Sequence, residues 1–329
     1  MTDLRDLSPS ISVALCTYNG MRFLQQQLDS IATQSRLPDE LVVFDDCSTD
    51  ETVDLLHAFA AAAPFAVRVG VNEVTLGSIR NFGRAIAECR GDVIALADQD
   101  DIWKPDKLAV LSQALLDRPE AGYAFSNAEL IDQAGVSMST TLWESIRFAP
   151  DSFRPAEQVA TLLRRNAATG ATMAFRSMLK SLVLPISDCF VHDYWIALLF
   201  SVFSQPGIPI SKCLIEYRQH NGQQIGTRQM GVIEKIKWVR QVGPTEYKKR
   251  TQAYLDLQNR LQRAQQEGVT VIPEHLFLVR QKIEHCSRRA DAHAAGGFAK
   301  IGRVFSEFLT GRYGQFSNSW QSVAEDLCF

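Results

Sequence analysis

The chain has 329 residues, of which 46% are hydrophobic, and a formal net charge of -3 at pH 7. This composition supplies a large core, and the near-neutral charge excludes a general attraction to nucleic acid, so no nucleic-acid partner is expected. The seven cysteines form no Cys-x-x-Cys pair and are odd in number, which favours a reducing cytoplasm over a disulfide framework. Residues 1–10 do not read as a signal peptide, and the longest apolar run, 191–203, is too short to span a bilayer, so we expect no transmembrane helix.

The first 121 residues alternate short apolar runs with amphipathic segments. Strands are predicted over 11–16, 41–44, 66–69 and 93–97, and helices over 23–33, 52–62, 79–89 and 107–116. Such alternation indicates a largely parallel sheet covered by helices. Polar loops follow three of the strands, at 17–20, 45–50 and 98–101. Because ligands bind at the carboxyl ends of the strands in open α/β sheets, these loops are expected to form one site.

Beyond residue 121 the pattern is less regular. Further strands are predicted at 122–126, 171–176 and 208–218, a loop up to about 151, and helices at 157–165, 192–203, 232–242, 246–267 and 273–293. The predicted organisation is a short flexible tail (1–10), an α/β domain (11–226) with halves 11–121 and 122–226, and a helical C-terminal region (227–329).

The apolar run 93–97 ends abruptly in three carboxylates, Asp98, Asp100 and Asp101. Clustered carboxylates repel one another and lose hydration when partly buried, so a divalent cation, Mg²⁺ or Mn²⁺, is the expected resident. Carboxylates that hold such a cation indicate a diphosphate ligand. For Asp101, a charge interaction with the N-terminus of the following helix is an equal alternative.

Together these loops resemble the family 2 glycosyltransferases, nucleotide-sugar enzymes of the GT-A fold, and within them the bacterial rhamnosyltransferase-like group. The resemblance rests on ISVALCTYN at 11–19, VVFDDCSTD at 42–50 and LADQDDIW at 96–103, and covers roughly residues 11–226. It implies an α/β fold with a GT-A-type, Rossmann-like, mixed and mostly parallel sheet flanked by helices, followed by a helical C-terminal extension.

The resemblance also implies a donor site. Its nucleotide-binding residues would be Thr17, Tyr18, Asn19, Asp45, Asp46, Arg80, Asn81, Asp98 and Gln99. Three of them have plainer alternatives: Asp45 could brace its loop, Asp46 could form a turn, and Arg80 could make an ordinary surface salt bridge. Ser48 and Asp50 could simply cap the following helix. Cys47 stands where the family most often has glycine, which makes the local backbone less permissive.

The metal and acceptor sides follow from later motifs of the same family. Asp100 would ligate the cation, with Asp98 and with His220 from the YRQHN segment, although a lone histidine is often only a structural hydrogen-bonding residue. Asp193, in FVHDYW at the start of an apolar helix, resembles the catalytic base, and a plain helix N-cap is the alternative. The acceptor-side residues would be Gly170, His192 and Trp195, with a simple turn before a strand as the alternative for Gly170.

The implied activity is inverting, metal-dependent transfer of a sugar, with rhamnose as a candidate, from a dTDP- or UDP-sugar to a glycan or lipid-linked glycan in bacterial cell-surface polysaccharide synthesis. A nucleotidyltransferase would also use an acidic metal site, but the chain lacks the early glycine-rich, basic loop of such enzymes. A non-catalytic nucleotide- or sugar-binding module is the other alternative. Binding alone would not require Asp100, Asp193 and His220 in the same chain, so this alternative is disfavoured.

The C-terminal region contains an apolar series at helical spacing, formed by Phe298, Ile301, Val304, Phe305, Phe308 and Leu309, with Lys300, Arg303 and Arg312 nearby. Amphipathic helices usually face a core, so packing against the catalytic domain or a second subunit is expected. Peripheral contact with the inner face of the cytoplasmic membrane is the alternative for this otherwise cytoplasmic protein.

Overall fold

The structure is a computed structural model that describes residues 9–220 and 244–328, so the predicted helix at 232–242 and most of the predicted tail lie outside the described residues. The chain divides into two compact units. One comprises Met1–Arg154, Ala168–Phe200 and Gln205–Thr227, and the other Pro155–Ala167, Ser201–Ser204 and Arg228–Phe329. Residues 155–167 and 201–204, which the sequence assigns to the α/β domain, therefore cluster with the C-terminal helices.

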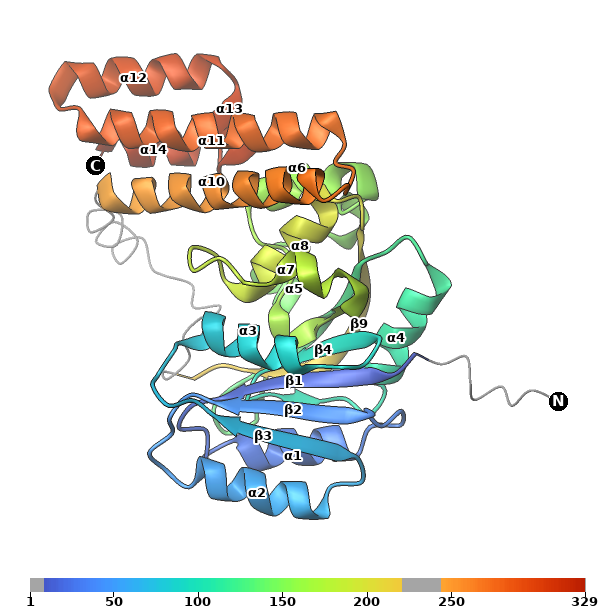
Figure 1. The fold of residues 1–329 in the computed structure, drawn as a ribbon. Helices are drawn as coiled ribbons and strands as arrows, with labels where there is room; N and C mark the ends of the chain where they lie inside the picture. Colours follow the sequence, from blue (N-terminus) through green and yellow to red (C-terminus); the bar gives the residue numbers. More distant parts are fainter. Residues whose placement is uncertain (1–8, 221–243, 329) are drawn as a thin grey trace. The chain divides into compact units, whose positions relative to one another are not determined.

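The first unit begins with four parallel strands in the order β3-β2-β1-β4. They are β1 (Ile11–Thr17), β2 (Glu40–Asp45), β3 (Ala66–Val71) and β4 (Val93–Ala97). The crossover helices are α1 (Leu24–Ala32), α2 (Thr52–Ala62) and α3 (Ser78–Glu88), and Figure 1 shows α3 on one side of the sheet and the other two on the opposite side. Every side chain of β4 is buried, which explains its uninterrupted apolar sequence.

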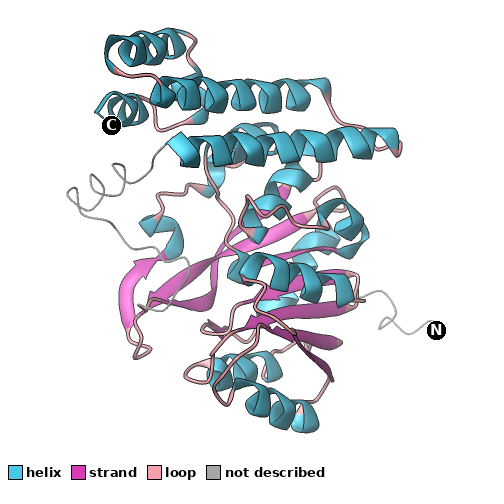
Figure 2. Cartoon of the chain, turned by 60° about the vertical axis from the view of Figure 1, so that its left-hand side comes forward, coloured by secondary structure: helices cyan, strands magenta, loops and turns pink. Residues whose placement is uncertain are grey.

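After β4 the sheet becomes mixed, as predicted. Its order continues β4-β8-β6-β9-β5, with β7 paired to β6, so the described residues form one nine-stranded sheet (Figure 2). Neighbouring strands are antiparallel at β4/β8, β6/β8, β6/β7 and β5/β9, and parallel at β6/β9. The new strands are β5 (Ile102–Trp103), β6 (Tyr123–Ile131), β7 (Ser137–Thr141), β8 (Met173–Arg176) and β9 (Gly207–Arg218). The helices of this half are α4 (Lys107–Asp117), α5 (Leu142–Ser145), α7 (Lys180–Val183) and α8 (His192–Val202).

The predicted loop before residue 151 is wrong in part, because it contains β7 and α5. The β7 sequence, SMSTT, is polar and mostly exposed, so it carries no hydrophobic alternation. The short α5 is fixed locally by a capping box, in which Thr141 and Glu144 satisfy each other's backbone amides. Strand β5 is only two residues long and exists because it pairs with β9, a non-local contact.

The second unit is helical within its described residues. It contains α6 (Pro155–Arg164), α10 (Pro244–Gln266), α11 (Pro273–Ala294), α12 (Gly297–Leu309), α13 (Arg312–Phe316) and α14 (Trp320–Cys328). Helix α6 belongs here because the Arg164 guanidinium donates to the carbonyls of Gly314 and Gln315. In the described parts of the chain, no helix combines the length and the apolar character needed to cross a membrane.

Candidate active site at the carboxyl ends of the strands

The loops after β1 and β2 are joined by the buried carboxylate of Asp45. It accepts hydrogen bonds from the Thr17 hydroxyl (2.7 Å), the Ser48 amide (2.7 Å) and the Ser48 hydroxyl (2.6 Å). Asp45 therefore braces the two loops, which is the plainer of its two predicted roles. Ser48 serves the same junction, because its hydroxyl also accepts from the Asn19 amide at 2.8 Å, and it is not a helix cap.

Asp46 holds the segment that leads into α3. Its carboxylate, only 4% exposed, accepts from the Asn72 side chain (2.7 Å) and from the amides of Leu76 (2.7 Å) and Gly77 (2.8 Å). Gly77 has a φ of +79°, a conformation that suits glycine. Asn81 continues this network by donating to the Phe44 carbonyl at 2.8 Å. Asp46 and Asn81 thus fix the loop before α3 and the start of that helix. Their contact with a nucleotide stays a prediction.

The first loop is also tied to the acidic loop after β4. The Tyr18 amide donates to the Gln99 side-chain oxygen at 2.8 Å, and the Gln99 side chain donates back to the Tyr18 carbonyl at 3.1 Å. Asn19 adds a bond from the Thr49 amide to its Oδ1 at 2.8 Å. Tyr18 is 46% exposed, so an aromatic residue is accessible beside the acidic loop.

Arg80, at the start of α3, forms a bidentate ion pair with Asp188 over 2.9 and 2.5 Å. Both side chains are more than half exposed. The hydrogen bonds and charge of Asp188 raise the pKa of Arg80, and the pKa of Asp188 is lowered in turn. Arg80 therefore forms an ordinary surface salt bridge, which was the alternative to its predicted role in nucleotide binding. A donor phosphate would have to compete with Asp188 for the Arg80 guanidinium.

The acidic loop after β4 brings carboxylates from distant parts of the chain together. Burial, followed by the charges of Asp100 and Asp193, raises the pKa of Asp98 to about 7, while Lys107 opposes this rise. Asp98 and Asp193 lie 95 positions apart in the sequence, so their interaction is produced by the fold. The structure thus places the candidate base beside the candidate metal-binding loop.

His220 joins this cluster from the end of β9. Its Nε2 lies 2.7 Å from Oδ2 of Asp100, and each side chain is 14% exposed. Buried Arg218 orders the same loop, because its Nε donates to the Asp100 carbonyl at 2.8 Å and its amide donates to Asp101 Oδ1 at 3.1 Å. The predicted neighbourhood of Asp100 and His220 is therefore present in the structure.

Asp101 is fully buried, and its Oδ2 atom has no hydrogen-bond partner among the described residues. Burial, together with the charges of Asp100 and Asp98, raises its pKa well above the usual range. Helix α4 starts only at Lys107 and has no acidic residue in its first turn. The suggested interaction of Asp101 with that helix terminus is therefore wrong, because β5 intervenes and such effects are confined to the first turn.

Lys107 and Tyr217 belong to this site although the sequence analysis missed both. The buried Lys107 ammonium donates to the Ala171 carbonyl at 2.5 Å and lies 3.5 Å from the centroid of the Trp103 ring. Burial, then the charges of Asp101, Asp98, Asp100 and Asp193, raise the pKa of the Tyr217 phenol well above its usual value. One signal was available: Lys107 shares the buried face of α4 with Leu111 and Leu115 at helical spacing.

Asp193 lies in the first turn of α8 and is 8% exposed. Its Oδ2 accepts from the Gly170 amide at 2.8 Å, and its Oδ1 accepts from the Tyr194 amide at 2.5 Å. A Cβ on Gly170 would lie 2.6 Å from His192 Nε2, so this close approach requires glycine. Gly170 also begins the short 3-10 turn Gly170–Thr172 before β8, which is the simpler of its two predicted roles, and its place on the acceptor side stays a prediction.

His192 and Trp195 differ in what they offer a ligand. The His192 ring stacks on Phe82 with centroids 3.8 Å apart, and neither ring nitrogen has a hydrogen-bond partner among the described residues. Burial lowers the pKa of His192, which favours the neutral imidazole. Trp195 is 1% exposed and its indole donates to the Val183 carbonyl at 2.8 Å, so it supports the wall behind the site from within the core.

The donor atoms of this site suit a divalent cation only in part. No group of three or more His, Cys, Asp or Glu residues in ligating geometry occurs within residues 9–220 and 244–328. Mg²⁺ and related cations, however, are commonly held by one or two carboxylates together with substrate phosphates. The Asp100 carboxylate and the His220 imidazole, 2.7 Å apart, are such a small set, and they fit a cation that binds along with a diphosphate.

Solved structures with the same architecture are GT-A glycosyltransferases, which confirms the predicted fold class. The chain matches Staphylococcus aureus TarS 1-349 in complex with UDP-GlcNAc with a TM-score of 0.54 at 16% identity, over 93% of this chain and 92% of that one. It matches the mannosyltransferase PcManGT from Pyrobaculum calidifontis, in complex with GDP-Man and Mn²⁺, with a TM-score of 0.51 at 17% identity, over 97% and 85%. The fold is thus that of the GT-A class.

The sequence model described as Glycosyl transferase family 2 matches residues 12–182, and the chain belongs to this family. It is 26% identical to the putative teichuronic acid biosynthesis glycosyltransferase TuaG of Bacillus subtilis over 65% of this chain and 80% of TuaG. It is 34% identical to the dTDP-rhamnosyl transferase RfbG of Shigella flexneri over 29% of this chain and 34% of RfbG. The match to the uncharacterized protein Rv1520 of Mycobacterium tuberculosis, 29% identical over 55% of this chain, spans about half (52%) of that relative's length.

Proposed function

We propose that the chain is an inverting glycosyltransferase that moves a sugar from a nucleoside diphosphate donor to a hydroxyl group of a glycan or lipid-linked glycan. The observation that carries the proposal is the hydrogen bond from the Gly170 amide to Asp193. Gly170 begins the turn before β8, and β8 pairs with β4, the strand that ends in the acidic loop. A single displacement requires a base on the acceptor side and a diphosphate site on the other side of the same sugar. Asp193 and the pair Asp98 and Asp100 supply these two parts.

In this mechanism Asp193 accepts the proton of the acceptor hydroxyl as that oxygen attacks the anomeric carbon. The Gly170 amide fixes Oδ2, and the neighbouring His192 ring is buried against Phe82. Asp100, His220 and Asp98 would hold a Mn²⁺ or Mg²⁺ ion, which neutralises charge on the departing diphosphate when it is bound. Tyr18, which is exposed, offers an aromatic ring for stacking with the nucleotide base.

The donor we propose is a dTDP- or UDP-sugar, with rhamnose as the leading candidate for the sugar. RfbG, named as a dTDP-rhamnosyl transferase, supports the nucleotide and the sugar, and TuaG supports a role in bacterial cell-surface polysaccharide synthesis. PcManGT, solved with GDP-Man and Mn²⁺, supports a divalent cation. A lipid-linked acceptor would place the protein in the cytoplasm, at the inner face of the membrane.

Thermal stabilisation by nucleotides tests the donor half of the proposal. UDP, dTDP, GDP and CDP are each added to the wild type and to Asp100→Ala, with and without Mn²⁺. We expect one nucleotide to raise the melting temperature of the wild type only with Mn²⁺, and the shift to disappear in the variant. A shift that is equal in both proteins would remove Asp100 from the metal site.

Product analysis tests the reaction class. A glycosyltransferase releases the nucleoside diphosphate from its sugar donor, whereas a nucleotidyltransferase would release pyrophosphate. The released nucleotide is therefore identified by chromatography after incubation with each dTDP- and UDP-sugar. Pyrophosphate release would contradict the proposed function, as would the absence of any transfer or hydrolysis with a donor whose nucleotide binds.

A further inference from the structure

Arg218 is the last residue of β9, and its side chain is among the largest fully buried ones of the described chain. Its guanidinium reaches three other segments. Nε donates to the Asp100 carbonyl of the acidic loop at 2.8 Å, and Nη2 donates to the Gln26 side-chain oxygen on α1 at 2.7 Å. Nη1 donates to the carbonyl of Asp132, in the turn between β6 and β7, at 3.4 Å. One rigid, planar fork therefore joins the acidic loop to α1 and to that turn.

The same guanidinium is connected to His220 through Phe23, the residue before α1. The Cζ atom of Arg218 lies 4.6 Å from the centroid of the Phe23 ring, a distance typical of a cation–π contact. The imidazole of His220 also packs on Phe23, with ring centroids 5.0 Å apart, and its Nε2 lies 2.7 Å from Asp100 Oδ2. Arg218 thus contacts the main chain of one member of the Asp100–His220 pair and the ring that supports the other member.

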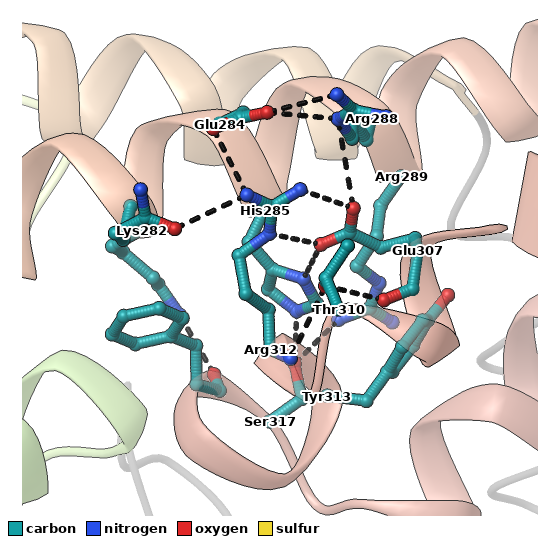
Figure 3. A network of polar contacts seen from close by, with 12 residues as sticks. Lys282, Glu284, His285, Arg288, Arg289, Glu307, Thr310, Arg312, Tyr313 and Ser317 are labelled. Atoms are coloured by element: carbon teal, nitrogen blue, oxygen red, sulfur yellow. Dashed lines mark hydrogen bonds and ion pairs between the residues drawn. The ribbon is translucent and has the colours of Figure 1, made fainter.

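The way in which Arg218 holds Asp100 differs from the usual pairing of a buried arginine with a carboxylate. Figure 3 shows the usual pairing in the second unit, where Arg312 donates from Nε and Nη2 to the two carboxylate oxygens of Glu307, both at 2.7 Å. Arg218 instead holds Asp100 by its carbonyl, while Oδ2 of Asp100 faces His220. A guanidinium on the carboxylate would occupy the oxygens that a cation needs. On the carbonyl, it fixes the loop and leaves those oxygens to other partners.

We propose that Arg218 is a positioning residue for cation binding, because it sets the separation of Asp100 Oδ2 and His220 Nε2. Groups that orient metal ligands without touching the metal typically contribute about 10- to 100-fold to metal affinity. Lysine could not replace Arg218, since one ammonium cannot bond to the acidic loop and to α1 in the same fixed geometry. The cation itself rests on the proposed function, whereas the arrangement of the Asp100–His220 pair does not.

Titration with Mn²⁺ tests this proposal on Arg218→Lys, with Arg176→Lys as the matched control. Arg176 also donates from β8 to backbone carbonyls, those of Ala121 at 2.8 Å and Leu115 at 2.5 Å. It pairs with Val93, however, and so lies at the end of β4 opposite to the acidic loop. Mn²⁺ is added to each protein in the presence of dTDP or UDP, and the concentration that gives half of the maximal shift in melting temperature is measured.

We expect Arg218→Lys to need about 10- to 100-fold more Mn²⁺ than the wild type, and Arg176→Lys to need the wild-type concentration even if it unfolds at a lower temperature. The kcat of Arg218→Lys for nucleoside diphosphate release should approach that of the wild type once Mn²⁺ is saturating. A general loss of stability would not produce this recovery, so the pattern separates positioning of the metal ligands from support of the fold.

Gln26→Ala keeps the proposal testable if Arg218→Lys does not fold. Gln26 is exposed on α1, so its replacement removes the partner of Arg218 Nη2 without opening a cavity. The matched control is Gln25→Ala, because Gln25 is an exposed neighbour whose side chain donates to Asp29 at 2.7 Å instead. Gln26→Ala should raise the Mn²⁺ requirement by a smaller factor than Arg218→Lys, and Gln25→Ala should leave it unchanged.

The imidazole resonance of His220 in the metal-free protein gives a second readout, assigned by its loss in His220→Gln. It should move in Arg218→Lys and Gln26→Ala and stay in place in both controls. An unmoved resonance in the folded variants would overturn the proposal, as would a wild-type Mn²⁺ requirement. If the resonance moves but the wild type itself shows no Mn²⁺-dependent shift, the metal-dependent function is contradicted, and the role of Arg218 in holding the Asp100–His220 pair is supported.

Discussion

The amide of Gly170 donates a hydrogen bond to Oδ2 of Asp193 across 2.8 Å, although the two residues belong to separate elements of the mixed half of the sheet. This bond orients the carboxylate that we propose as the base. It also explains why glycine occupies position 170, since a Cβ there would meet His192 Nε2 at 2.6 Å. The surroundings of this carboxylate are therefore set by one backbone amide and by the absence of a side chain at position 170.

Replacing Asp193 by Asn should remove most turnover and leave nucleotide binding intact. The amide keeps the shape of the side chain but cannot accept the acceptor proton, and loss of a positioned general base typically costs about 10²- to 10⁴-fold in rate. The measurement is kcat for nucleoside diphosphate release, together with the nucleotide-induced thermal shift. Asp151→Asn, an exposed aspartate outside the site, is the control. Wild-type turnover in Asp193→Asn would exclude Asp193 as the base.

Gly170→Ala should destabilise the protein and impair catalysis together. The new methyl group would force His192 away from its stacked position on Phe82, and overpacking of a tight site typically costs about 1–3 kcal/mol. Urea unfolding and kcat are the two measurements. Gly302→Ala in α12 is the matched control, because a Cβ there meets nothing within 4 Å and alanine favours a helix. If the two variants are equally stable, the packing around Gly170 is looser than the distances indicate.

The contribution of Asp98 to the stability of the nucleotide-free protein should fall as the pH rises from about 4 toward 7. Its folded-state pKa is raised to about 7, mainly by burial and then by Asp100 and Asp193, whereas the unfolded side chain titrates near 3.9. Between these values the folded state binds the extra proton, so raising the pH favours unfolding. Unfolding free energies of the wild type and Asp98→Asn, measured from pH 4 to 8, should show a flatter dependence in the variant. Parallel curves for the two proteins would show that Asp98 does not cause the pH dependence of the unfolding free energy.

The sequence predicted the first half of the fold well because each element there is encoded locally. The runs that became β1, β2 and β4 are continuous and apolar, and the helices between them have a clear period. Elements that depend on distant partners were missed. The polar β7 and the two-residue β5 are strands only because β6 and β9 lie beside them.

The candidate site shows the same division. Asp98 and Asp100 were found from their place after an apolar run, and Asp193 and His220 from motifs of the family. The fold brings these residues near one another. The partners inside the fold were not predictable. Neither the ion pair of Arg80 with Asp188 nor the burial of Lys107 beside Trp103 is expressed in local sequence, because each depends on how separate segments meet.

Lys107→Met should strongly destabilise the protein. Lys107 donates to the Ala171 carbonyl, lies over the Trp103 ring and opposes the charge of Asp98 and Asp101, all within the buried site. Removing one partner from a buried set of charges typically costs about 3–5 kcal/mol, because the remaining charge is left uncompensated. Urea unfolding at pH 7.5 measures this loss.

The matched control for this variant is Lys212→Met. Lys212 pairs with Asp106 at the surface, where such pairs contribute about 0–1 kcal/mol. Lys107→Met should also raise the pKa of Asp98 further, since Lys107 is the group that lowers it, and so move the pH dependence of unfolding upward. If Lys107→Met and Lys212→Met unfold alike and the pH dependence stays in place, Lys107 does not balance the carboxylates of the site.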